Sequence, residues 1–168
     1  MASIKPRVLV LGHSFIRRLF EAVDSGKFAE NFGLKQCQIS GRGYGGGTVR
    51  GVRSSCRHYL EQFQPHIVIL QIRGNDLCDS KLSADSLAYD IYNFALEMSN
   101  NFGALVYVCE IFPRLRPRGM APHLYEVRRK NVNKGLTVLL LAQERVSIWP
   151  HKRIFNSPLQ HSYMMLVT

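Results

Sequence analysis

A run of branched aliphatic residues near the start of the chain, followed at once by Gly-His-Ser, constrains the fold more than any other feature. Residues 7–11 are Arg-Val-Leu-Val-Leu and lack the polar alternation of a half-exposed strand. Such a run is typical of a strand buried on both faces of a parallel sheet. Residues 15–19 then place apolar side chains at helical spacing. The stretch predicts a central strand, a sharp turn and a helix that begins near Ser14.

Ser14 at this turn has two interpretations. Serine is among the preferred helix N-cap residues, and the stretch alone favours that structural role. The alternative is a reactive hydroxyl, because open α/β sheets build their sites at the carboxyl ends of central strands. The start of a helix also stabilises a developing negative charge.

The rest of the chain alternates between strand and helix patterns. Apolar runs predict strands over residues 34–40, 66–72, 104–109 and 145–148. Helical periodicity predicts helices over residues 16–32, 49–63, 84–100 and 123–143, with Thr48 and Ser83 as N-caps of the second and third. This alternation indicates a doubly wound α/β fold. We expect a three-layer α/β/α sandwich with a mostly parallel, flavodoxin-like sheet of about five strands in the order 2-1-3-4-5.

The length favours one domain over residues 1–168, with a core over about 7–150 and an irregular tail over 151–168. No apolar run is long enough to span a membrane, and the N-terminus lacks a secretory apolar segment, so we expect a cytoplasmic, intracellular protein. The four cysteines show no Cys-x-x-Cys pairing. Reduced thiols and no structural zinc are therefore expected.

The protein is strongly basic, and its charge is unevenly distributed along the chain. The formal net charge is +10, and residues 112–168 hold 10 Lys and Arg against 2 acidic residues. This part of the chain could attract phosphates or an acidic partner, or it could be a solvated surface or a piece of a longer, more acidic polypeptide. Direct nucleic-acid binding is possible but not favoured, because aromatic residues are not interleaved with the basic runs.

Three polar features follow three successive predicted strands. They are Ser14, the glycine-rich stretch over residues 41–47, which we expect to be irregular, and Asn75. Glycines let backbone N–H groups approach a ligand closely, although this stretch matches neither a Walker loop nor a dinucleotide fingerprint. Because the carboxyl ends of parallel strands share one edge, the three should meet there. Their N–H groups could stabilise the oxyanion of a tetrahedral intermediate.

These residues resemble the sequence blocks of the SGNH hydrolases, also called GDSL-type esterases. Leu9-Val10-Leu11-Gly12-His13-Ser14 resembles the first block, Gly45-Gly46-Gly47-Thr48 the second and Gly74-Asn75-Asp76-Leu77 the third. Glu110-Ile111-Phe112-Pro113 resembles the exit of the fourth strand in these proteins.

The resemblance implies a serine hydrolase that acts on small-molecule esters or acyl groups through an acyl-enzyme, without metal or cofactor. It makes Ser14 the nucleophile, gives the Gly46 backbone N–H an oxyanion-binding role and makes Asn75 the side-chain donor.

Three departures from the family pattern stand out. His13 replaces the usual Asp before the nucleophile, and Arg73, which could narrow the site or bring a cation beside it, replaces a Gly of the third block. The family also carries an Asp-x-x-His near the C-terminus, but this sequence has no Asp after Asp90. His161 is the better-placed surrogate base, and His151 is expected to be an ordinary surface or loop histidine.

A serine hydroxyl without an adjacent base is a weak nucleophile, so weak or lost activity is expected unless His161 acts. The alternative is a catalytically inactive SGNH-fold binding module, whose basic segments 114–118 and 128–130 face an anionic partner. A third interpretation is a phosphate-binding flavodoxin-like protein that uses the glycine-rich stretch. The sequence argues against it, because this stretch lacks the lysine that a phosphate-binding loop usually carries.

Overall fold

The computed structural model describes residues 5–72 and 74–151. Arg73 and the tail over residues 152–168 lie outside the described residues, and so does the predicted surrogate base His161. The expectations for Arg73, for His161 and for an irregular tail therefore stay predictions.

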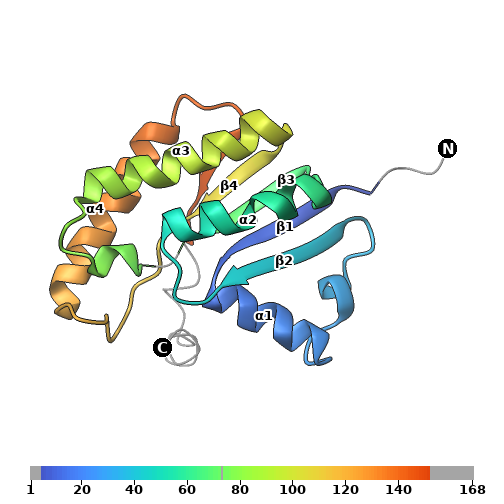
Figure 1. Ribbon diagram of the computed structural model, residues 1–168, viewed down its shortest axis with the longest axis horizontal. Helices are drawn as coiled ribbons and strands as arrows, with labels where there is room; N and C mark the ends of the chain where they lie inside the picture. The colour runs from blue at the N-terminus through green and yellow to red at the C-terminus, as the bar shows by residue number, and fades with distance from the viewer. Residues whose placement is uncertain (1–4, 73, 152–168) are drawn as a thin grey trace.

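Strands and helices alternate along the described part of the chain (Figure 1). The strands are β1 (Arg7–His13), β2 (Gln38–Tyr44), β3 (Ile67–Gln71), β4 (Leu105–Cys109) and β5 (Val146–Trp149). The α-helices are α1 (Ser14–Asp24), α2 (Val49–Phe63), α3 (Ala84–Phe102) and α4 (Pro122–Leu140), with short 3-10 helices at η1 (Glu30–Gly33) and η2 (Asp76–Cys78). Every strand pair is parallel, and the order β2-β1-β3-β4-β5 confirms the prediction.

The second strand lies further along the chain than predicted. It includes Gly41 and Gly43, which we expected in an irregular loop. A Cβ atom on Gly41 would lie 2.0 Å from the Phe20 ring, and one on Gly43 would lie 2.1 Å from the Arg17 backbone nitrogen. These glycines therefore let α1 pack directly on β2. Helix α1 also ends at Asp24, earlier than predicted, because Gly26 follows with a φ of 75°.

One face of the sheet is fully covered. Its side chains form two rows across the strands, Leu9, Val68, Val106 and Val146 in the first and Leu11, Leu70 and Val108 in the second. All of these side chains are buried, and they share one hydrophobic core with buried residues of α2, α3 and α4.

The other face is covered by α1 over β1 and β2. Further along this face, Leu105 is 38% exposed and Trp149 is 47% exposed, and Trp149 packs edge-on against Tyr107. The described residues thus form the expected three layers, with three helices on one face and α1 on the other. None of the described helices combines the length and the apolar character needed to cross a membrane.

Candidate active site

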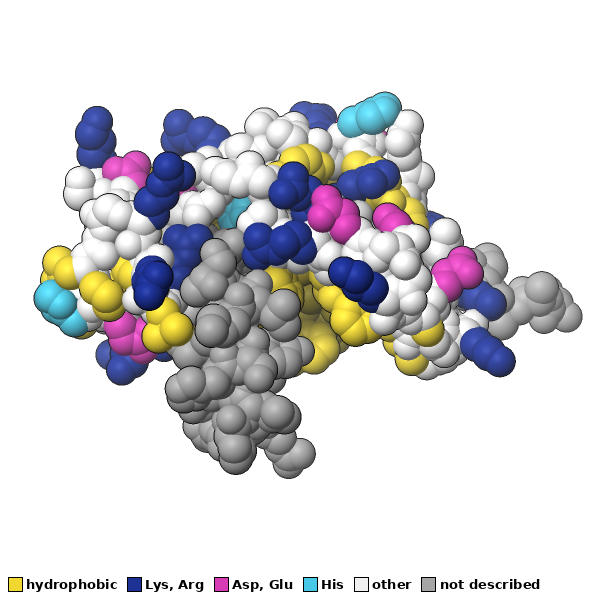
Figure 2. All heavy atoms as spheres, turned by 90° about the horizontal axis from the view of Figure 1, so that it is seen from below, with side chains coloured by type: hydrophobic (Ala, Val, Ile, Leu, Met, Phe, Trp, Pro, Cys, Tyr) yellow, Lys and Arg dark blue, Asp and Glu magenta, His cyan; other side chains and the backbone are white. Residues whose placement is uncertain are grey.

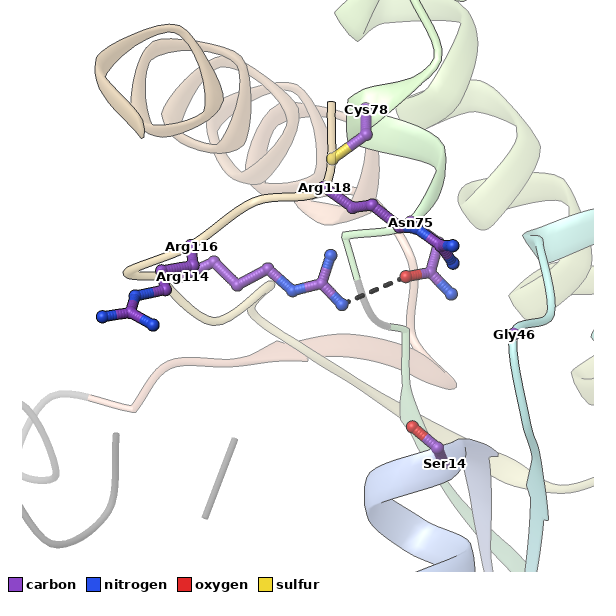
Figure 3. Close-up of a pocket in the computed structure, with 7 residues that line it drawn as sticks. All are labelled: Ser14, Gly46, Asn75, Cys78, Arg114, Arg116 and Arg118. Atoms are coloured by element: carbon purple, nitrogen blue, oxygen red, sulfur yellow. Dashed lines mark hydrogen bonds between the residues drawn. The ribbon is translucent and has the colours of Figure 1, made fainter. Parts of the chain in front are cut away.

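The segments that follow β1, β2, β3 and β4 surround one pocket of about 450 Å³ (Figure 3). The described residues that line it are Ser14, Gly46, Asn75, Cys78, Arg114, Arg116 and Arg118. The structure therefore brings together the three features that the sequence places after successive strands. It adds three arginines of the basic segment 114–118 to the same pocket.

Ser14 is the first residue of α1 and follows β1 directly. The N-cap position belongs to His13, whose backbone is extended (φ −98°, ψ −160°), so the interpretation of Ser14 as an N-cap is wrong. Ser14 is half-buried and lines the pocket. At this position its hydroxyl lies beside the positive end of the helix dipole, where a negative charge is stabilised.

Gly46 lies in the glycine loop (residues 45–47) between β2 and α2. Its φ of 67° is in the left-handed region, and no atom lies within 4 Å of where a Cβ would be. The backbone conformation, rather than lack of space, therefore favours glycine at this position. Thr48 ends the loop as the N-cap of α2, and its hydroxyl oxygen accepts a 3.1 Å hydrogen bond from the Gly51 N–H, as predicted.

Asn75 is held at both ends of its side-chain amide. Its Nδ2 donates to the Gly47 carbonyl oxygen at 3.1 Å, and its Oδ1 accepts from Arg114 Nη2 at 3.1 Å. Because a guanidinium can only donate, Arg114 fixes which atom of the amide is the oxygen. Since Nδ2 carries two hydrogens, its second N–H can serve a ligand in the pocket.

Asp76 ties the turn after β3 to the start of α2. It is 4% exposed, and its Oδ2 accepts a 3.1 Å hydrogen bond from the Val49 N–H. Burial raises the pKa of this carboxyl, although the hydrogen bond from Val49 opposes the shift. Asp76 therefore positions the glycine loop and Asn75 relative to each other, a role that sequence reasoning missed.

Gly74 lets α4 approach the turn that carries Asn75. A Cβ at Gly74 would lie 2.0 Å from the Tyr125 hydroxyl oxygen. Tyr125 is buried, and its hydroxyl donates a 3.0 Å hydrogen bond to the Phe112 carbonyl oxygen. The glycine of this sequence block is thus required by packing, and Tyr125 links the turn after β3 to the segment after β4.

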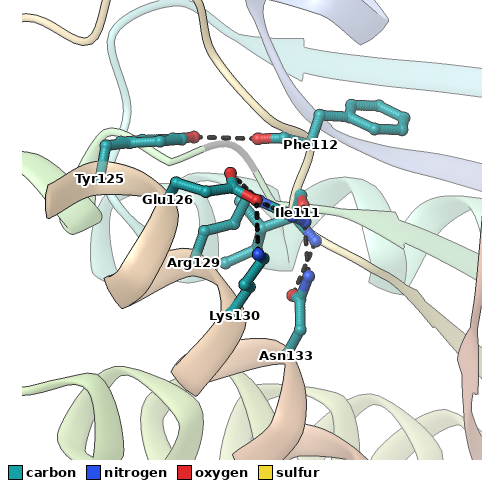
Figure 4. A network of polar contacts seen from close by, with 7 residues as sticks. All are labelled: Ile111, Phe112, Tyr125, Glu126, Arg129, Lys130 and Asn133. Carbon is teal, nitrogen blue, oxygen red and sulfur yellow. Dashed lines mark hydrogen bonds and ion pairs between the residues drawn. The ribbon is translucent and has the colours of Figure 1, made fainter. Parts of the chain in front are cut away.

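Further contacts from α4 fix the segment after β4 (Figure 4). Asn133 accepts from the Ile111 N–H at 2.9 Å and donates to the Ile111 carbonyl at 3.3 Å, and Arg129 Nη1 donates to the same carbonyl at 2.9 Å. Arg129 is itself held by two hydrogen bonds to Glu126, and this contact lowers the pKa of Glu126. This network anchors the start of the arginine loop (residues 113–121).

The expectation that segment 128–130 faces an anionic partner is not met by two of its three side chains. The Arg129 side chain is 15% exposed and pairs with Glu126. Arg128 donates to the carbonyl oxygens of Asp79 and Leu82. By contrast, Arg114, Arg116 and Arg118 line the pocket. The sequence signal for them was the run of alternating arginines directly after the fourth-strand block.

His151 follows β5 outside any helix or strand, as expected for a loop histidine, and it is half-buried. Its ring lies 4.5 Å from that of Phe112, centroid to centroid, and its backbone N–H donates to Glu110 Oε2 at 3.2 Å. Burial lowers the pKa of the imidazole, against an opposing effect of Glu110. His151 is absent from the described residues that line the pocket.

Within the described residues, no group of three or more His, Cys, Asp or Glu side chains is arranged to hold a metal ion. All four cysteines are free thiols. Burial raises the pKa of Cys56 and of Cys109 to about 12, which makes both poor nucleophiles.

Comparison with protein-family models and with curated protein sequences gives no match. Solved structures do match. A lipase/acylhydrolase from Enterococcus faecalis aligns with a TM-score of 0.66 at 14% identity, over 92% of this chain and 81% of that chain. A GDSL-like lipase from Bacteroides thetaiotaomicron aligns with a TM-score of 0.65 at 17% identity, over 89% of this chain and 72% of that chain. The psychrotrophic esterase EstA from Pseudoalteromonas sp., in a structure inhibited by monoethylphosphonate, aligns with a TM-score of 0.60 at 13% identity. That alignment covers 97% of this chain and 94% of that chain.

These likenesses, together with the strand order, show that the chain has an SGNH hydrolase-like fold, as the sequence blocks predicted.

Proposed function

We propose that this chain is an SGNH-type serine hydrolase that cleaves esters through Ser14, with low turnover. One observation carries the proposal: Ser14, Gly46 and Asn75 come from the segments that follow three different strands, and they line the same pocket. A hydroxyl beside two kinds of N–H donor is the arrangement that acyl transfer needs, because the donors stabilise the oxyanion while the hydroxyl attacks.

The reaction proceeds in two steps. Ser14 Oγ attacks the ester carbonyl carbon and passes its proton to a general base, while the carbonyl oxygen becomes an oxyanion bound by the Gly46 N–H and Asn75 Nδ2. The C–O bond to the alcohol breaks, and the alcohol takes the proton from the base. Water then attacks the acyl-Ser14 ester with help from the same base and releases the carboxylic acid.

We assign the role of general base to His161, in agreement with its place near the C-terminus in the chain order of the family blocks. No Asp follows Asp90, so His161 lacks the orienting carboxylate that this family supplies three residues earlier. A base that is poorly oriented costs several orders of magnitude in rate, and the oxyanion donors alone leave a residual acceleration. Low turnover is therefore part of the proposal.

Hydrolysis of 4-nitrophenyl acetate by the full chain tests this function, with Ser14→Ala and His161→Ala as the informative variants and His151→Ala as the matched control. Turnover that both informative variants abolish and the control retains supports the proposal. A fluorophosphonate probe should label the wild-type chain and not Ser14→Ala; the neighbour EstA, whose structure is inhibited by monoethylphosphonate, makes phosphorus reagents a reasonable choice.

A binding module without catalysis is the competing function, and the arginines in the pocket favour it to the extent that they suit an anionic ligand. Turnover no faster than that of Ser14→Ala, together with absence of labelling, would reject the hydrolase and leave this alternative.

A further inference from the structure

We propose that the pocket selects esters that carry a negative charge, a carboxylate or a phosphate, on the part of the substrate that faces the arginine loop. This inference rests on the proposed function for its reaction and goes beyond it by naming the class of substrate. It is carried by the charge, the bonding and the placement of three side chains.

The charge of the pocket is one-sided. Arg114, Arg116 and Arg118 line it, and none of the described lining residues is Asp or Glu. In the described part of the chain, none of the three guanidinium groups forms an ion pair with a carboxylate. On the face of the molecule shown in Figure 2, Lys and Arg side chains are spread widely and acidic side chains are fewer. The net charge of +10 adds a long-range attraction for anions.

The arginines differ in how they are bonded. Arg114 is half-buried and donates to Asn75, so it positions the amide as well as adding charge. Arg116 and Arg118 are exposed, and neither side chain donates a hydrogen bond to a described residue. In Figure 3 the Arg118 side chain extends toward Asn75 from the arginine loop. Its donors are therefore available to a ligand.

The start of the arginine loop is anchored by hydrogen bonds, so the positive charge of its arginines is held at the site. Asn133 and Arg129 fix both backbone polar groups of Ile111, and Tyr125 fixes the Phe112 carbonyl. The loop therefore leaves the sheet in a defined direction, over the pocket that contains Ser14. Guanidinium groups bind carboxylate and phosphate oxygens with two parallel hydrogen bonds, which a neutral ester cannot accept in the same way.

Binding of uncleavable amides tests the inference independently of turnover. The ligands are 3-acetamidobenzoate, 3-acetamidophenyl phosphate and the neutral 3-acetamidobenzamide, titrated by calorimetry into the 168-residue chain. We expect at least one anionic ligand to bind about tenfold or more tightly than the neutral 3-acetamidobenzamide. This difference in affinity should shrink as the salt concentration rises. The two anions distinguish a carboxylate preference from a phosphate preference.

Two double variants with the same charge change locate the effect. R116Q/R118Q should abolish the preference, whereas K27Q/K35Q, which alters two exposed lysines beyond the far end of α1, should retain it. Circular dichroism checks that both variants fold. Equal affinity for charged and neutral ligands, no measurable binding of any, or a preference that R116Q/R118Q retains would each overturn the inference.

Turnover of the matching esters separates this inference from the proposed function. 3-Acetoxybenzoate should be cleaved faster than 3-acetoxybenzamide by wild type, and neither by Ser14→Ala. If both esters are cleaved equally in a Ser14-dependent way, the charge preference is wrong and the hydrolase stands. If neither is cleaved but the anionic amide still binds preferentially, the hydrolase is wrong and the anion-selecting pocket stands.

Discussion

Asn75 and Gly47, which lie on different loops of the pocket, are joined by a 3.1 Å hydrogen bond from Asn75 Nδ2 to the Gly47 carbonyl oxygen. The bond places the side-chain donor of one loop beside the backbone donors of the other. Arg114 holds the opposite end of the same amide through Oδ1. The donor that an oxyanion would use is therefore oriented before any substrate arrives, which is what makes such donors effective.

Replacing Asn75 by Asp should remove this donor with little change in shape. The new carboxylate can still accept from Arg114, but it cannot donate to Gly47 or to an oxyanion. We expect kcat for 4-nitrophenyl acetate to fall by about 10²- to 10³-fold with a smaller change in KM, because the lost interaction forms mainly in the transition state. Steady-state kinetics measures both constants, and an Asn75→Asp chain with wild-type kcat would exclude Asn75 from the oxyanion site.

Gly74→Ala should destabilise the fold through Tyr125. The new Cβ would lie 2.0 Å from the Tyr125 hydroxyl oxygen and 2.7 Å from two ring carbons, so the buried ring must move. Overpacking of this kind should lower the free energy of unfolding by about 1–3 kcal/mol, and urea denaturation would measure the change.

Gly45→Ala is the matched control for this substitution. At Gly45 the nearest atom to a new Cβ is 3.7 Å away, and the residue does not have a positive φ. The Gly45→Ala substitution should therefore change the unfolding free energy by less than about 0.5 kcal/mol. Equal stability of the two variants would contradict the packing role assigned to Gly74.

The strand order and the meeting of Ser14, Gly46 and Asn75 could be predicted because both depend on local patterns. Apolar runs locate buried strands, and the polar residues that follow parallel strands necessarily reach one edge of the sheet. The limits of β2 could not be predicted in the same way. Gly41 and Gly43 look like loop residues until the contact with α1 is known, because their need for glycine comes from Phe20 and Arg17.

The arginines of the pocket are a second feature that the sequence pattern could not predict. Alternating Arg and Pro residues predict an exposed basic loop, and no local pattern indicates that Arg114, Arg116 and Arg118 line the pocket. Their position depends on α4, whose contacts with Ile111 set the direction of the loop. Side-chain partners that are distant in sequence are decided by tertiary packing, which periodicity does not encode.

The two faces of β4 should respond differently to truncation. Val106 is 1% exposed in the core beneath α2, α3 and α4, whereas its neighbour Leu105 is 38% exposed on the other face. Val106→Ala should lower the unfolding free energy by about 2 kcal/mol, from two buried carbons and the cavity that they leave. Leu105→Ala should lower the unfolding free energy by less, although it removes more atoms.

Chemical denaturation of both variants at the same pH provides the comparison. The order of the two effects is the informative quantity, since absolute values depend on how far the surroundings relax. A Leu105→Ala chain less stable than Val106→Ala would mean that this region of the second face is covered as fully as the first.

His151 should make the fold sensitive to mild acid. Burial lowers the pKa of its imidazole in the folded chain, with the opposing effect of Glu110 smaller. In the unfolded chain the imidazole titrates near its ordinary pKa of about 6.5. As the pH falls through that value, the unfolded state takes up the proton more readily than the folded state, so the free energy of unfolding falls.

His151→Gln removes this titration while keeping the backbone N–H that donates to Glu110. Wild type should therefore lose more stability than His151→Gln between pH 7.5 and pH 5.5. Urea midpoints at the two pH values measure the difference, and the remaining histidines cancel because both chains carry them. Identical losses in the two chains would show that the His151 imidazole titrates alike in the folded and unfolded states, which contradicts its burial against Phe112.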